Sequence, residues 1–246
     1  ARWDEPGFPI VFDTQNIAFW DSRIGKYRSF VRDFDGKIRG IRTATSKDLV
    51  NWTRRDWLEY PGTPVEQLYT NQILPYYRAP HLLIGFPVRY VDRGWVPGTR
   101  RLPSLKQREQ RSRSNKRYGS AVTDTVLMTS RDGRSFHRWN QAFLRPGLRT
   151  RHNWAYGDNY MAWQMVETES PEDDSPRELS MYATESYFTG KTSRLRRYTL
   201  RLDGFASLFA PREGGELITR PLRFRGDRLS VNVVTSAAGS VRVEIL

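Results

Sequence analysis

Short runs of β-branched and aromatic residues recur along the chain, interrupted roughly every 8–12 residues by Gly, Pro, Asn or Asp. This pattern is typical of all-β proteins, and no stretch has the periodicity of an amphipathic helix. In residues 240–246, apolar and charged side chains alternate as in a strand with one buried face. The predicted strands cover residues 17–21, 26–34, 38–45, 81–91, 123–130, 178–182, 196–205 and 240–246.

One motif occurs twice between predicted strands. Residues 46–52 read SKDLVNW and residues 130–139 read SRDGRSFHRW, so each has Ser, Asp two positions later, a turn and then Trp. A polar segment with a carboxylate precedes each motif, and a third such segment lies at 154–160. Four strands per repeat at this spacing are typical of β-propeller blades. We interpret four residues of the motifs as structural: Asp48, Asp132, Trp52 and Trp139.

The composition changes after Ala210, where glycines and a proline separate short predicted strands. We predict that residues 1–210 form about three blades of a partial five-bladed β-propeller. Residues 211–246 are predicted to begin a C-terminal β-sandwich. Because the chain starts at Ala1 with no Met and no signal-peptide pattern, we expect a processed or truncated piece.

The composition also excludes several kinds of chemistry. The chain has no Cys, which excludes a thiolate nucleophile, Cys-ligated zinc and an iron–sulfur cluster. Its three His residues lack the spacing of zinc ligands, so we expect no metal and no cofactor. A mean hydropathy of −0.68 leaves no room for a membrane span.

The net charge of +13 is concentrated in residues 93–117, which hold nine basic residues against Glu109 and leave only +5 for the rest. We predict a solvated, mobile basic insertion between two strands. Such an insertion could grip an anionic polymer, or it could be an ordinary solvated loop. Nucleic acid is the weaker choice, since no helix-turn-helix, zinc-finger or RNP-like motif accompanies the basic residues.

The order DTQNIAFWDSRIGKYRSFVRDF, SKDLVNW, EQLYTNQILPYY, SRDGRSFHRW and LDGFASLFAPREGGELITRPLRF resembles glycoside-hydrolase-family-32-like proteins of planctomycete-type bacteria. These belong to a superfamily of five-bladed propellers that includes families 32, 43 and 68. The resemblance covers nearly the whole chain and implies a propeller followed by a β-sandwich. It also implies that leading blades, with at least one catalytic carboxylate, lie outside this chain. We favour an extracellular or periplasmic location.

Glycoside hydrolysis needs two carboxylates that flank the scissile bond. A carboxylate at the start of an inner propeller strand is well placed for this, and the candidates are Asp13, Glu66 and Asp158. Each also has a structural interpretation: a turn residue that caps backbone amides at Asp13, an exposed loop acid at Glu66 and a turn residue at Asp158. Sugar binding uses aromatic faces and planar hydrogen-bonding groups. The candidates for it are Asn16, Trp20, Tyr69, Asn71, Arg89 and Trp154.

The leading hypothesis is therefore a carbohydrate-active protein, a glycoside hydrolase with paired carboxylates. The alternative is a non-catalytic propeller that binds a polysaccharide or, through residues 93–117, a polyanion. A phosphorylase stays open because Arg78 or Arg89 could hold phosphate. The expected partner is a carbohydrate, with an acidic or sulfated glycan as one option.

Overall fold

The computed structural model describes residue 13 and residues 15–150, 153–173, 175–187, 193–223 and 225–245. The chain divides into two units, Ala1–Phe205 and Ala206–Leu246. In the second unit every described side chain is exposed and no described residue is in a strand or helix. The strand predicted at 240–246 is therefore wrong for residues 240–245, because a strand needs a hydrogen-bonded neighbour and these residues have none within the described part of the chain. That residues 211–246 begin a β-sandwich stays a prediction.

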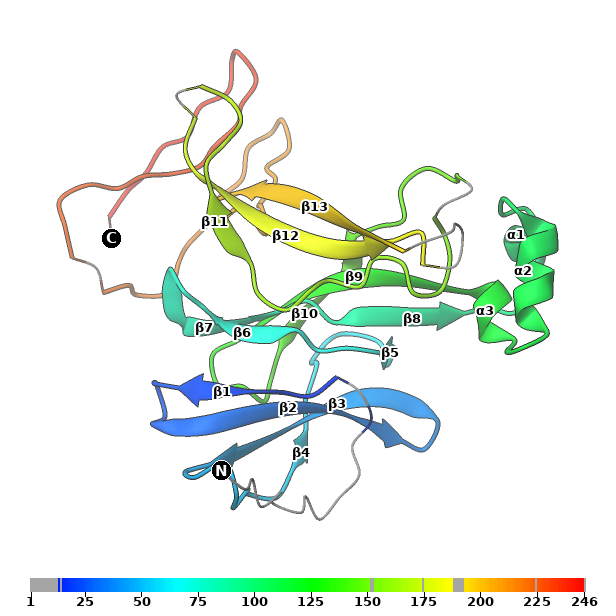
Figure 1. The fold of residues 1–246 in the computed structure, drawn as a ribbon. Helices are drawn as coiled ribbons and strands as arrows, with labels where there is room; N and C mark the ends of the chain where they lie inside the picture. Colours follow the sequence, from blue (N-terminus) through cyan, green and yellow to red (C-terminus); the bar gives the residue numbers. More distant parts are fainter. Residues whose placement is uncertain are drawn as a thin grey trace. The chain divides into compact units, whose positions relative to one another are not determined.

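The first sheet, called sheet 1, is a four-stranded antiparallel meander (Figure 1). Its strands pair in chain order, and the three long ones match the predicted ranges to within one residue. Gly36, at φ +60°, supports the tight turn between the second and third strands. The strands are β1 (Ile17–Asp21), β2 (Lys26–Asp35), β3 (Ile38–Ser46) and β4 (Asp56–Trp57).

Sheet 2 is a second antiparallel sheet in which the strand predicted at 81–91 is interrupted. Phe86 and Pro87 separate two shorter strands, and proline has no N–H to donate to a ladder. The two shorter strands both pair with the long strand that follows them in the chain. The strand before them is also divided in two, and each half pairs with one of the shorter strands. Sheet 2 is therefore a meander in which the first and second strands each have a gap. Its strands are β5 (Gln67–Leu68), β6 (Ile73–Tyr76), β7 (Ala79–Gly85), β8 (Val88–Asp92), β9 (Ala121–Ser130) and β10 (His137–Leu144).

Sheet 3 consists of β11 (Val166–Thr168), β12 (Glu178–Glu185) and β13 (Arg194–Arg201), again antiparallel. Both longer strands overlap the predicted ranges, with β12 ending three residues later than predicted and β13 four residues earlier. The described part of the first unit is thus nearly all β with antiparallel sheets, which confirms the all-β part of the predicted fold class. The propeller architecture and the number of its blades stay predictions.

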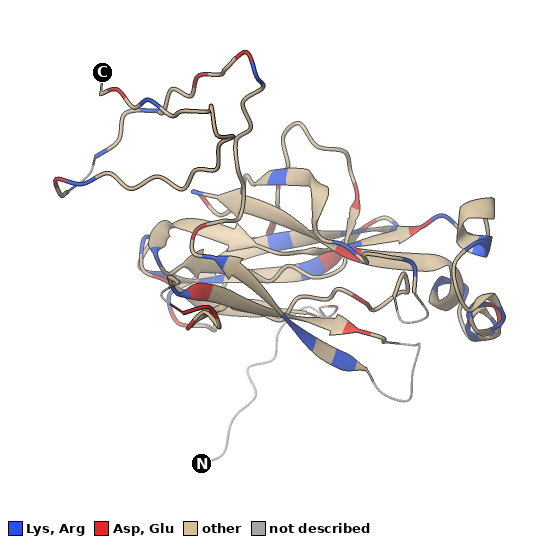
Figure 2. Ribbon diagram, turned by 90° about the horizontal axis from the view of Figure 1, so that it is seen from above, with Lys and Arg blue, Asp and Glu red and all other residues tan. Residues whose placement is uncertain are grey.

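The basic insertion lies between two strands, as predicted, but it is helical. The whole connection between β8 and β9, residues 93–120, contains α1 (Pro97–Arg100), α2 (Leu105–Ser112) and α3 (Arg117–Ser120), and we call it the helical insertion. The buried side chain of Arg108 explains this difference, because its guanidinium donates to the carbonyls of Trp154 at 2.7 Å and Asn153 at 3.1 Å. Hydrophobic periodicity reveals a helix that is held by an apolar face. It cannot reveal a helix that is held by the hydrogen bonds of one buried arginine. Figure 2 shows Lys and Arg across the strands as well as on these helices.

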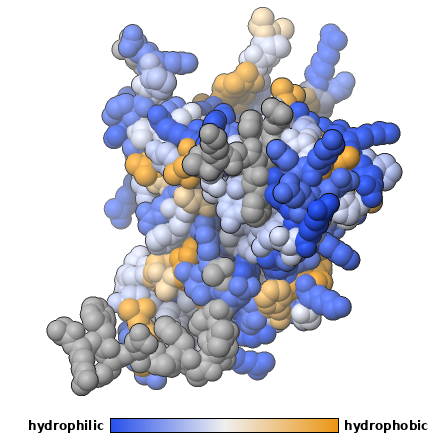
Figure 3. Space-filling model, turned by 45° about the vertical axis from the view of Figure 1, so that its right-hand side comes forward, coloured by the Kyte–Doolittle hydropathy of each residue, from blue (hydrophilic) through white to orange (hydrophobic). Residues whose placement is uncertain are grey.

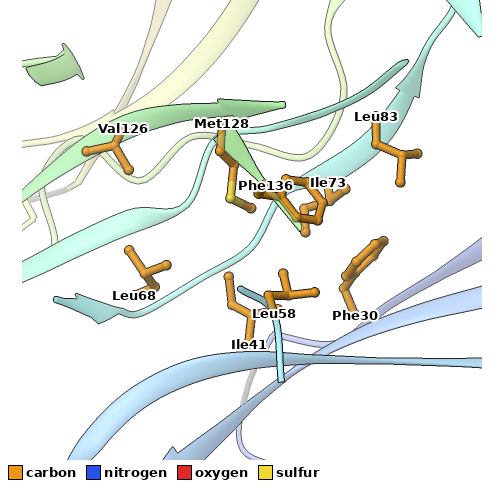
Figure 4. Packing of buried hydrophobic residues seen from close by; sticks show 9 residues of the cluster. All are labelled: Phe30, Ile41, Leu58, Leu68, Ile73, Leu83, Val126, Met128 and Phe136. Carbon is orange, nitrogen blue, oxygen red and sulfur yellow. The ribbon is translucent and has the colours of Figure 1, made fainter. Parts of the chain in front are cut away.

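Sheet 2 lies between sheets 1 and 3 and is buried on both faces (Figure 1). Along β9, Val126 and Met128 face one apolar cluster while Leu127 faces the other. A continuous apolar run of this kind is typical of a strand covered on both sides. Figure 4 shows the cluster between sheets 1 and 2, made of Phe30, Ile41, Leu58, Leu68, Ile73, Leu83, Val126, Met128 and Phe136.

The two S-x-D motifs form the same turn. Asp48 Oδ1 accepts from the N–H groups of Val50 and Asn51, and Asp132 Oδ1 accepts from those of Arg134 and Ser135. The structural role predicted for both aspartates is therefore supported by their contacts. The equivalent of Trp52, however, is the buried Phe136, six residues after each Ser, and the match with Trp139 is wrong. Trp139 instead packs against the apolar cluster between sheets 2 and 3.

A buried ion-pair group ties the end of β1 to sheet 2. The Asp21 carboxylate, 1% exposed, accepts from Arg23 at 2.8 Å and from Arg28 at 3.0 Å. Arg23 also donates to the carbonyls of His81 and Arg131. Burial alone would raise the pKa of Asp21, but the hydrogen bonds and charges of the two arginines lower it overall. The group thus couples the two sheets through charge-assisted hydrogen bonds.

We predict that Asp21→Asn lowers the free energy of unfolding at pH 7 by on the order of 3 kcal/mol, because the buried Arg28 and the half-buried Arg23 lose their counter-charge. The lowered pKa of Asp21 means that this stabilisation is present above the unfolded pKa and is lost as pH falls through the folded pKa. Urea unfolding at pH 7 and pH 3 should therefore show a smaller difference between variant and parent at pH 3. The exposed Asp35→Asn is the control, and equal losses for both variants would contradict the prediction.

We also predict that Gly133→Ala is more destabilising than Gly36→Ala. Both glycines have positive φ, so both substitutions carry a backbone cost of about 1 kcal/mol. An added Cβ at Gly133 would clash with the guanidinium group of Arg28, whereas nothing among the described residues lies within 4 Å at Gly36. Arg28 must then shift away from Asp21, at a further cost of at least about 1 kcal/mol. Indistinguishable urea midpoints for the two variants would show that Arg28 yields freely.

Candidate functional site

Four tyrosines gather where three segments of the chain meet. Tyr69 follows β5, Tyr90 lies in β8, and Tyr156 and Tyr160 lie in the segment before β11. The Tyr69 ring centroid is 6.1 Å from that of Tyr90, 5.8 Å from that of Tyr156 and 5.6 Å from that of Tyr160. The Tyr156 hydroxyl donates to the Tyr69 hydroxyl at 2.8 Å. Tyr69 and Tyr156 thus each contact all the other rings of the group.

Three arginines lie over these rings. The Arg32 guanidinium carbon is 4.2 Å from the Tyr69 centroid, and that of Arg39 is 5.0 Å from Tyr69 and 5.2 Å from Tyr90. Arg117 lies 5.2 Å from the centroid of Tyr156. All these distances are within cation–π range. We call the seven residues the arginine–tyrosine cluster: Arg32, Arg39, Arg117, Tyr69, Tyr90, Tyr156 and Tyr160.

Local structure explains how the arginines reach the rings. Arg39 pairs with Phe34 across the β2–β3 hairpin, and Arg32 lies two residues from Phe34, so both arginines are on the same sheet face. Arg32 donates to the Tyr69 carbonyl at 2.7 Å, and Arg39 donates to Oε1 of Gln67 at 2.6 Å. Arg117 comes from α3 in the helical insertion. Sheet 1, sheet 2 and the insertion therefore all contribute to the cluster.

The cluster carries more positive than negative charge. Asp13 is paired with Arg32, and the exposed Asp92 lies 3.3 Å from the Tyr90 hydroxyl. Among the described residues, no carboxylate lies within ion-pair distance of Arg39 or Arg117. Burial, followed by the charge of Asp92, raises the pKa of Tyr90 to about 12, so its hydroxyl stays neutral at pH 7. Figure 3 brings the right-hand side of Figure 1 forward and shows a largely hydrophilic face.

Two of the predicted site residues lie at the cluster: Tyr69 belongs to it, and Asp13 pairs with Arg32. Asn71 and Asn16 lie close to these two along the chain. The buried Asn71 donates to the carbonyls of Gln15 at 3.0 Å and Phe30 at 3.3 Å, so it holds the segment before β1 against sheet 2. Asn16 is exposed beside that segment.

Glu66 and Arg89 belong to a separate ion-pair network. Arg89 contacts Glu66 at 3.0 Å and Asp124 at 2.7 Å, and the buried Arg138 donates to the second oxygen of Glu66. Both carboxylate oxygens of Glu66 are therefore held by arginines. Within the described part of the chain, no ion pair or hydrogen bond joins any two of the three predicted carboxylates.

Asp158 is 2% exposed. Its Oδ1 accepts from the N–H of Tyr187 at 2.8 Å, while its buried Oδ2 has no hydrogen-bond partner among the described residues. Burial raises the pKa of this carboxyl to about 6, against the opposing effects of backbone N–H groups and of Arg108. A raised pKa is what a general acid requires. The carboxyl itself is shielded from solvent.

The two predicted tryptophans have different surroundings. Trp20 is 52% exposed and meets Tyr27 edge-on at 5.0 Å, at the end of β1 away from Asp13. The Trp154 indole donates to the Gly147 carbonyl at 2.9 Å, and its own carbonyl accepts from Arg108. Trp154 therefore anchors the insertion rather than joining the tyrosines.

Sequence reasoning missed most of the cluster. Tyr156 and Tyr160 flank Asp158 in the third polar segment, and this proximity was a usable signal. Nothing in the sequence pattern singles out Arg32 or Arg39, because their partners lie tens of residues away. No group of three or more metal-binding side chains occurs in the described ranges. Nor does any helix there have the length and apolarity to cross a bilayer.

We predict that Asp158→Asn raises the free energy of unfolding at pH 7.5 by about 1–3 kcal/mol. The folded pKa of Asp158 is raised, so its stabilising contribution is present below the unfolded pKa and is lost as pH rises through about 6. The substituted asparagine carries no charge at any pH, so the variant avoids this loss of stability. The difference in free energy of unfolding between variant and parent should therefore be smaller at pH 4.5 than at pH 7.5. Urea unfolding at both pH values, with the exposed Asp173→Asn as control, measures the effect. A pH-independent difference would mean that Asp158 does not titrate with this pKa.

No family model matches the chain, and no curated protein matches it. Its fold is similar to that of several solved structures. One is an N-acetylgalactosamine deacetylase from F. plautii in complex with blood group B trisaccharide, with 8% identity and a TM-score of 0.48, covering 76% of this chain and 50% of that one. A GH32 β-fructofuranosidase from Bombyx mori has 12% identity and a TM-score of 0.41, with coverage of 72% and 30%.

A third similar structure is a fructofuranosidase from Schwanniomyces occidentalis complexed with fructose. It has 13% identity and a TM-score of 0.37, and the match covers 78% of this chain and 44% of that one. The chain therefore spans half or less of the length of these three structures. The family 32 resemblance and the bacterial source it implies stay predictions from the sequence.

Proposed function

We propose that this chain is part of a carbohydrate-active protein and that the arginine–tyrosine cluster is its sugar-binding site. The observation that carries the proposal is the convergence of four tyrosines and three arginines from distant segments around Tyr69. Binding sites for small polar ligands combine aromatic surface with a few fixed polar groups. The sequence resemblance points to the same class of ligand.

The side chains of the cluster suit a sugar ring. Tyr69, Tyr90 and Tyr160 are half-buried, so they combine solvent access with fixed positions. Tyrosine offers a ring face for the C–H groups of a pyranose and a hydroxyl for its polar edge. Guanidinium groups supply donors for ring hydroxyls, and the cation–π contacts hold them in place.

The hydrolytic form of the proposal assigns acid–base chemistry to Asp13, with Asp158 and Glu66 as the other candidates. Asp13 is favoured because it is the carboxylate paired with an arginine of the cluster. Glu66 is already bound on both oxygens, which favours a structural role. Asp158 has the raised pKa of an acid, but it needs a path to the substrate.

In the binding form of the proposal, the protein binds a glycan without cleaving it, and no carboxylate is required as an acid or base. It is the form that the contacts favour, because each predicted carboxylate has its own local partner. The phosphorylase alternative has less support, since Arg78 is paired with Asp203, and Arg89 with Glu66 and Asp124.

One experiment tests both forms. The chain is incubated with a panel of plant and bacterial oligosaccharides. Two quantities are measured: the amount of each glycan that stays bound to the protein, called retention, and the amount of cleaved product that is released. We expect retention of at least one glycan and a loss of affinity of about tenfold or more in Tyr90→Ala, which removes a ring worth about 1.4 kcal/mol or more of binding. Tyr77→Ala, an exposed tyrosine outside the cluster, is the control.

Product release that Asp13→Asn abolishes would establish the hydrolytic form. Retention without product would establish the binding form. The absence of retention for every glycan, with the folded state verified by circular dichroism, would overturn the proposal.

A further inference from the structure

We infer that the arginine–tyrosine cluster selects sugars that carry a carboxylate, that is, uronic acid residues, and that Arg39 and Arg117 hold this carboxylate. The inference rests on the proposed function, because it names the ligand class of the same site. It concerns Arg39, which no sequence pattern singled out, and Arg117, the last residue of the basic segment 93–117.

The charge balance of the cluster is the first argument. Arg32 is matched by Asp13, and Asp92 contacts the hydroxyls of Tyr90 and Ser120. Arg39 and Arg117 are both half-buried, and within the described ranges neither forms an ion pair with a carboxylate. Partly buried cations without a counter-charge are unfavourable, and an anionic ligand relieves that cost.

Unused donors are the second argument. Arg39 donates through Nη1 to Gln67, but its Nε is buried and has no acceptor among the described residues. The Nε of Arg117 is also buried without an acceptor there. Buried donors are nearly always satisfied in folded proteins, so neither guanidinium group has its full set of acceptors within the described part of the chain. Their remaining N–H groups are the ones that a ligand could use.

The position of the two arginines is the third argument. Arg39 lies over Tyr90, and the charges of Arg39 and Arg117 both oppose the rise in the pKa of Tyr90, so both act on one ring. Arg117 also lies over Tyr156, whose centroid is 6.0 Å from that of Tyr90. A ring bound against these tyrosines would have its charged substituent within reach of both guanidinium groups.

The geometry of the donors favours a carboxylate. A guanidinium presents parallel N–H groups in one plane, and the two oxygens of a carboxylate match that plane. In a uronic acid the carboxylate is attached directly to the sugar ring, so ring stacking and ion pairing occur together. The helical insertion then has a specific role, because it delivers Arg117, while its buried Arg108 fixes the helices to the chain near Trp154.

The test compares the affinity of the full chain for oligogalacturonate with its affinity for the fully methyl-esterified form, which keeps the sugar backbone and removes the charge. Isothermal titration calorimetry at 50 mM salt should show at least tenfold tighter binding of the free acid. Arg39→Gln and Arg117→Gln should each reduce this preference to about threefold or less. Arg39→Lys, which keeps the charge but loses the planar fork, should fall between Arg39→Gln and the parent.

Arg113→Gln is the matched control, because Arg113 is an exposed residue of the same insertion outside the cluster. It should keep the full preference, and thermal unfolding of each variant should verify the folded state. Equal binding of acid and ester would overturn this inference and leave the sugar-binding proposal intact. Tighter binding of a sulfated oligosaccharide than of oligogalacturonate would overturn the carboxylate assignment. Failure to bind any glycan of the earlier panel would instead overturn the proposed function.

Discussion

The burial of sheet 2 on both faces is the constraint on which the rest of the first unit depends. Two apolar clusters, one on each face, are built from alternate residues of the same strands, with Val126 and Leu127 facing opposite ways. Shifting one strand of sheet 2 by one residue would turn its side chains to the opposite face and disrupt both clusters. The strand register of sheet 2 therefore determines how sheets 1 and 3 pack against it. The ion pairs of Asp21 add a directional contact to this packing.

The candidate site is a consequence of this stacking. Sheet 1 supplies Arg32 and Arg39, sheet 2 supplies Tyr69 and Tyr90, and the segment before sheet 3 supplies the remaining tyrosines. None of these side chains forms a site within its own sheet. The cluster holds three guanidinium groups and few carboxylates. The tyrosine ring faces stabilise this positive charge in part through cation–π contacts.

Buried arginines have a second role in this chain. Arg108 in the insertion donates to backbone carbonyls. Arg138 lies over the Tyr60 ring and donates to Glu66. Burial lowers the pKa of Arg108 to about 10, which leaves it charged at neutral pH. Some of the many arginines therefore stabilise the interior through hydrogen bonds and ion pairs, and others contribute to the surface charge. The insertion is an ordered element for this reason.

The sequence by itself determined the three long strands of sheet 1, the all-β class and the repeated S-x-D turns, because these depend on alternation and on hydrogen bonds within a few residues. It also marked Asp13, at the start of one polar segment, and Tyr69, within the next, as candidates. Tertiary structure alone decided that the basic insertion is helical, that Glu66 is held by Arg89 and Arg138, and that Arg39 lies over Tyr90. These features depend on contacts between residues far apart in the chain, and such contacts leave no periodic trace in the sequence.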